Sequence, residues 1–138
     1  MTSALARRLA LFLAGATALG LVSGAALAKD ALIGPDAWRE MTTGKTLHYY
    51  KDGELYGKEY YPGGDDNTVV FRFPNGLCAE GRWGHSEGKF CFAFGDQLHC
   101  FWHVMRDGEI VVIGEEDGEE QTVETIADHE PIGCGSAI

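Results

Sequence analysis

From residue 44 onward, apolar and polar side chains alternate along short segments that are separated by Gly, Pro, Asn and Asp. A period of two is typical of strands that bury one face. The separating residues preset turns or tolerate a positive φ, so each break reads as a tight connection. The predicted strands span residues 46–51, 55–61, 67–73, 77–83, 89–94, 98–105, 109–113 and 121–126.

Eight strands joined by short turns predict a mostly β fold, an antiparallel up-and-down meander. Such a sheet protects its edges most simply by closing into a small barrel or a sandwich, in the manner of lipocalins and other calycins. Ahead of the strands, residues 34–41 predict one short N-terminal helix, with Pro35 in its first turn. We expect Trp38 on this helix to cover one end of the sheet.

Residues 89–104 form the densest aromatic stretch and predict a β-hairpin around Gly95-Asp96. A two-residue loop there places Phe94 opposite Gln97 and Cys91 opposite Cys100. The cysteine pair then falls on a non-hydrogen-bonded rung, where opposing Cα atoms are closest. A cross-strand disulfide between the two strands is the direct prediction.

The chain has four cysteines, an even number that suits a disulfide framework in a small exported protein. If Cys91 pairs with Cys100, Cys78 is left for Cys134, and that bond would tie the tail to the body. A competing scheme pairs Cys78 with Cys91 and Cys100 with Cys134. The sequence leaves both schemes open.

The first 28 residues have the organisation of a cleaved secretory signal. Arg7-Arg8 provides a basic start, residues 9–22 are apolar, and Ala26-Leu27-Ala28 resembles a cleavage site. No cysteine lies near that point, so no lipid anchor is expected. The prediction is a periplasmic or secreted single domain, residues 29–138, without a membrane anchor.

Without the signal, the chain keeps 9 basic and 21 acidic residues, a net charge of −12. This charge repels phosphates and anionic lipids. Nucleic acid and anionic membrane surfaces are therefore not expected as partners.

The cluster His99-Cys100-x-x-His103 is the one constellation that could suggest a metal. On a strand, however, the two histidines lie about 13 Å apart, and Cys100 points away from both. We therefore expect no metal, and two ordinary half-exposed histidines. We also expect both faces of the hairpin to be buried, with Trp83 and Trp102 in the core beside the disulfide.

No catalytic constellation is recognisable. Cys-x-x-Cys and Gly-x-Ser-x-Gly spacings are absent, and paired cysteines leave no free thiol. The sequence predicts a protein that is not an enzyme and has no cofactor.

Tyrosines gather in the first two strands and are the main candidates for recognition. In a small barrel, tyrosines can instead cap the open ends with their hydroxyls in water. The candidate binding residues are Tyr49, Tyr56, Tyr60 and Tyr61.

Several short motifs resemble a family of small exported bacterial proteins of unknown function. They are Thr43-Gly44-Lys45-Thr46, Tyr60-Tyr61-Pro62-Gly63-Gly64, Gly81-Arg82-Trp83, Lys89-Phe90-Cys91 and the segment from Cys100 to Gly108. The resemblance covers roughly residues 34–113 and implies the fold; it implies no catalytic residue. Cys78 and Cys134 are extra to its pattern.

These observations together predict a non-enzymatic exported β-barrel that binds a small ligand or an envelope protein. The alternative is a periplasmic inhibitor of a cell-wall hydrolase, similar to lysozyme inhibitors, steered to a basic enzyme by its acidic surface. An eight-stranded barrel can be filled by side chains or can hold a ligand.

Overall fold

A computed structural model describes residues 30–64 and 66–134. The predicted signal, residues 1–28, lies outside the described residues. The elements are β1 (Ala31–Leu32), α1 (Pro35–Thr42), β2 (Lys45–Lys51), β3 (Glu54–Tyr61), β4 (Thr68–Arg72), β5 (Cys78–Ser86), β6 (Lys89–Phe94), β7 (Gln97–Arg106), β8 (Glu109–Gly114) and β9 (Glu120–Asp128).

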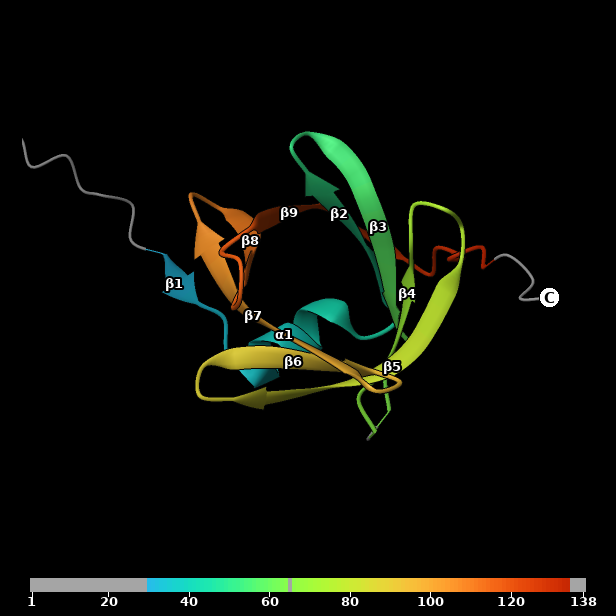
Figure 1. Ribbon diagram of the computed structural model, residues 1–138, viewed down its shortest axis with the longest axis horizontal. Coiled ribbons are helices and arrows are strands. Elements are labelled where there is room, and N and C mark those ends of the chain that lie inside the picture. The colour runs from blue at the N-terminus through green and yellow to red at the C-terminus, as the bar shows by residue number, and fades with distance from the viewer. Residues whose placement is uncertain (1–29, 65, 135–138) are drawn as a thin grey trace, which may run out of the picture.

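The strands β2 to β9 form a closed antiparallel barrel, which confirms the predicted mostly β, up-and-down fold. Neighbours along the chain pair with one another, and β2 closes the ring by pairing with β9. Figure 1 shows the strands as a ring with α1 visible through it. Every strand of the barrel thus has one face toward a shared interior.

The eight predicted strands all exist, and their ends differ by at most three residues. The largest difference is in β5, which continues through Ser86 and leaves only Glu87-Gly88 for the turn. One strand was missed. The two-residue β1 pairs with Met105 and Val104 of β7. It lies on the same edge of β7 as β6, beyond the point where β6 stops pairing at Phe101.

The helix α1 closes one end of the barrel with Trp38, as predicted. Trp38 is fully buried and contacts Tyr61, Phe90 and His103, with ring centroids 5.9, 5.7 and 4.5 Å away. Buried side chains fill this closed end: Ile33, Leu47, Val69, Trp83, Ile110 and Val123 among them.

The opposite end, which we call the mouth, is formed by the β2–β3, β4–β5, β6–β7 and β8–β9 turns. Large apolar side chains are exposed there, whereas the buried Trp38 of α1 fills the barrel at the opposite end. They are Leu55, Phe73, Leu77 and Leu98. The barrel is therefore asymmetric, packed around α1 and more open at the mouth.

Both predicted disulfides are present, Cys91–Cys100 and Cys78–Cys134. The hairpin register is also as predicted, with Phe94 opposite Gln97 and Cys91 opposite Cys100 at a Cα–Cα distance of 4.0 Å. This excludes the competing connectivity. Two disulfides fit a non-cytoplasmic protein.

The prediction that both faces of the β6–β7 hairpin are buried is wrong. Its outer face is largely accessible, since Leu98 is 64% exposed and Ala93 is exposed as well. Trp102 lies on this outer face, where Nζ of Lys89 is 5.7 Å from the centroid of its indole ring. Of the two tryptophans predicted in the core beside the disulfide, Trp83 belongs to the core and Trp102 does not. The aromatic content of the hairpin suggested two buried faces, whereas closure of the barrel buries one.

The tail after β9 is held to the barrel by more than the predicted Cys78–Cys134 disulfide. The Thr46 hydroxyl donates to the Glu130 carbonyl at 2.7 Å. The Glu130 carboxylate pairs with His48 and with Lys58, and these partners hold its pKa below the ordinary range.

We predict that Cys78→Ala/Cys134→Ala destabilises the protein more than Cys91→Ala/Cys100→Ala. The bonds close loops with sequence separations of 56 and 9, so chain entropy gives losses of about 4 and about 3 kcal/mol. Urea unfolding of both double variants measures the difference. Equal losses, or a larger loss for the hairpin pair, would contradict the prediction.

Candidate functional site

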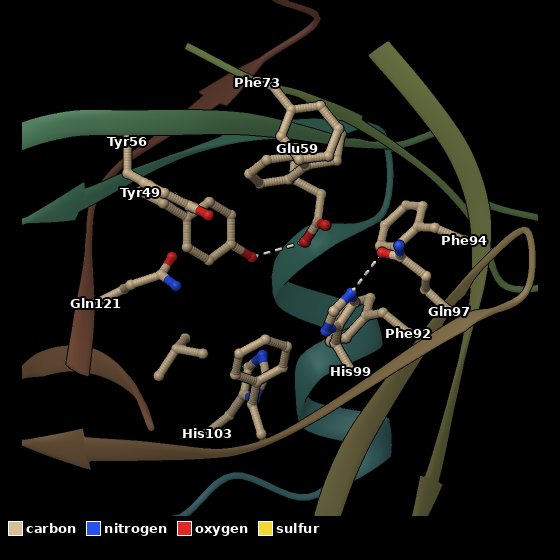
Figure 2. Close-up of a pocket in the computed structure, with 13 residues that line it drawn as sticks. Tyr49, Tyr56, Glu59, Phe73, Phe92, Phe94, Gln97, His99, His103 and Gln121 are labelled. Atoms are coloured by element: carbon tan, nitrogen blue, oxygen red, sulfur yellow. Dashed lines mark hydrogen bonds between the residues drawn. The ribbon is translucent and has the colours of Figure 1, made fainter. Parts of the chain in front are cut away.

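The mouth leads into a cavity of about 330 Å³ inside the barrel. Its walls come from β2, β3, β4, β6, β7, β8 and β9, so it occupies the interior and not a surface crevice. The lining is mostly aromatic with a few polar groups, as Figure 2 shows: Tyr49, Tyr56, Glu59, Phe71, Phe73, Phe92, Phe94, Gln97, His99, Phe101, His103, Val112 and Gln121. This combination is typical of small-molecule sites.

Two glycines in the wall keep the interior from being filled. A Cβ at Gly57 would lie 2.4 Å from Cζ of Phe71, and a Cβ at Gly81 would lie 2.6 Å from Cδ1 of Phe94. The two rings therefore occupy space beside the wall that a side chain at either glycine would need. Larger residues at either glycine would push the rings toward the centre of the cavity.

Glu59 is the single carboxylate in the lining and is only 4% exposed. Alternation along β3 directs Glu59 inward together with Tyr61, and Figure 2 shows its carboxylate pointing into the cavity. The hydroxyls of Tyr49 and Tyr61 donate to its Oε1 at 2.8 and 2.5 Å. The part of the chain that the structure describes supplies no hydrogen bond to Oε2.

Burial raises the pKa of Glu59 to about 7, although the two tyrosine hydrogen bonds act in the opposite direction. Burial, followed by the nearby carboxylate, raises the pKa of Tyr49 and Tyr61 well above the ordinary value. Both tyrosines therefore stay protonated and remain donors. Near neutral pH, the carboxyl group can hold or release a proton with little cost.

His103 lies at the floor of the cavity and is 1% exposed, contrary to the prediction of a half-exposed side chain. It contacts Phe92 as well as Trp38 and Phe90, and neither ring nitrogen has a hydrogen-bond partner among the described residues. Burial lowers its pKa to about 3, so the imidazole is neutral. A buried polar group without a partner is uncommon in folded proteins and calls for an explanation, such as a partner molecule in the cavity.

His99 is exposed, nearer the mouth, where its Nε2 lies 3.3 Å from Oε1 of Gln97. Within residues 30–64 and 66–134, no group of three or more His, Cys, Asp or Glu side chains is placed to hold a metal ion.

The four candidate tyrosines lie in different environments. Tyr49 and Tyr56 line the cavity, and Tyr56 does so because it is the extra residue where the β2–β3 register shifts. Tyr61 is buried below the cavity and reaches it only through Glu59. Tyr60 points to the outside of the barrel, half-buried, away from the other three.

Glu59 and most of the aromatic lining were not among the predicted binding residues. A signal was present, because His99, Phe101 and His103 share one face of β7 opposite Phe92. Glu59 lies two residues from Tyr61, at the same parity. A charged residue at an inward-facing position of a predicted strand is unusual, and this feature could have identified Glu59 as a candidate site residue.

Neither the family models, the curated proteins nor the solved structures with which the chain was compared match it. The resemblance to the exported bacterial family therefore stays a prediction. None of the helices in the described residues has the length and apolar character needed to cross a membrane.

We predict that Glu59→Gln makes the protein more stable than wild type at alkaline pH. Folded Glu59 binds its proton more tightly than the unfolded side chain, so its contribution to stability falls as pH rises from 4.5 to about 7. The shift corresponds to roughly 3 kcal/mol, whereas Gln keeps an acceptor for both tyrosines. Urea unfolding between pH 4.5 and 8 measures the difference between the two proteins.

His103 acts with the opposite sign, since its lowered pKa makes stability rise as pH increases from about 3 to 6.5. That contribution is common to both proteins and cancels in their difference. Glu80→Gln, at an exposed position, is the matched control and should show no such trend. A Glu59→Gln difference that is constant with pH would contradict the prediction.

Proposed function

We propose that this protein is a non-enzymatic binder of a small organic molecule, which it holds inside the barrel. The observation that supports it is the cavity of about 330 Å³, lined by aromatic rings around Glu59 and His103. A barrel selected for stability alone would fill this space, because empty volume costs packing energy. The buried polar groups add a further cost that a bound ligand can offset.

The predicted signal and the two disulfides support a periplasmic or secreted location for this activity. The alternative, an inhibitor of a cell-wall hydrolase, is supported only by the acidic charge. The cavity favours a ligand over a protein partner, because its lining faces the interior.

We predict saturable binding of the neutral apolar dye N-phenyl-1-naphthylamine, with one dye per chain. Val112→Phe should weaken binding at least tenfold, since Val112 lines the cavity and the added ring would occupy it. Fluorescence titration measures the affinity, with circular dichroism to show that the variant is folded.

Val70→Phe is the matched control, because Val70 lies on β4 between inward-facing Val69 and Phe71 and points outward. Its affinity should stay within twofold of wild type. Equal loss in both variants, or no dye binding to the wild-type protein, would contradict the proposed function.

A further inference from the structure

The charge pattern of the cavity narrows the class of ligand. Among the described residues that line it, Glu59 is the one carboxylate, and none is a lysine or an arginine. An anionic ligand would thus meet a carboxyl group and no basic side chain. Fatty acids and other carboxylates are poorly matched to this interior.

The two oxygens of Glu59 are not equivalent. Oε1 accepts from both Tyr49 and Tyr61, whereas Oε2 has no donor from the described chain. The tyrosines fix the carboxylate in position and leave one oxygen for a donor from within the cavity. A charged donor would form the strongest hydrogen bond there.

Aromatic rings make up most of the wall of the cavity that Glu59 also lines. Tyr49 and Tyr56 both pack on Phe71 with centroids 6.1 Å apart, and Phe92 and Phe101 lie 6.0 Å apart on another wall. The faces of such rings attract cations, and the attraction is stronger away from water. The acidic charge of the whole chain also favours the approach of a cation.

We infer that the ligand is a small, mostly apolar amine, whose ammonium group pairs with Oε2 of Glu59 while its apolar part lies among the aromatic rings. This inference rests on the proposed function and specifies its ligand. The cavity has about twice the volume of one that accepts benzene, so it has room for an amine with two rings.

Binding of an ammonium group is coupled to the protonation of Glu59. At pH 7 about half of the free protein carries a proton on Glu59. The ammonium group favours the carboxylate, so this proton is released on binding and affinity rises with pH toward 8. Among the described residues, the titratable groups around Glu59 are Tyr49 and Tyr61 beside it and the other titratable residues of the lining, Tyr56, His99 and His103; Phe71 on β4 is apolar.

Three probes of one shape test the inference: tryptamine, tryptophol and indole-3-acetate, which place an ammonium, a hydroxyl or a carboxylate on the same indole ring. Isothermal titration calorimetry at pH 8 should give at least tenfold tighter binding for tryptamine than for tryptophol, and none for indole-3-acetate. At pH 7, titrations in buffers of different ionisation enthalpy should show release of about half a proton with tryptamine.

Glu59→Gln should weaken tryptamine binding at least tenfold, abolish the proton release and leave tryptophol within threefold. Glu80→Gln, which removes the same charge from the outer surface, should leave tryptamine binding within twofold. His99→Gln, which removes the imidazole near the mouth, should preserve the proton release.

Tighter binding of tryptophol or indole-3-acetate, or an unchanged affinity of Glu59→Gln for tryptamine, would overturn the inference and leave the proposed function intact. Binding of none of the three probes would overturn it as well. The proposed function is judged separately, by the dye and the Val112→Phe variant.

Discussion

Closure of the eight-stranded sheet is the constraint on which the rest of the structure depends. Once β2 pairs with β9, each strand has one face toward the interior, and the parity of every inward residue is fixed around the ring. Trp38 then seals one end, so the space above it is reached from the mouth. Gly57 and Gly81 preserve that space, because they let two phenylalanines lie on the wall.

The cavity places polar groups where a core would be apolar. A carboxyl group with a raised pKa and an imidazole with a lowered pKa are each destabilising in their charged form, and burial is the cause of both. The protein tolerates them because two disulfides and the packed closed end stabilise the rest. A bound ligand that supplied the missing partner would offset their cost to folding.

Much of the fold could be predicted because its determinants are local. The alternation of apolar and polar residues predicted the strands, and the two-residue loop at Gly95-Asp96 predicted the register that places Cys91 opposite Cys100. The site could not be predicted in the same way. Glu59 and His103 are far apart in the chain and line one cavity only after the sheet curls closed. The burial of His103 also depends on Trp38, which belongs to neither strand.

The Cys91–Cys100 bond also has a kinetic consequence. It cross-links β6 to β7 below the Gly95-Asp96 turn, so this side of the mouth cannot widen by separation of the two strands. Across the mouth, Asp52-Gly53 joins β2 to β3 with no such covalent link. Entry and exit of a molecule would therefore depend on fluctuations of the turns that carry no cross-link between their two strands, the β2–β3 turn among them.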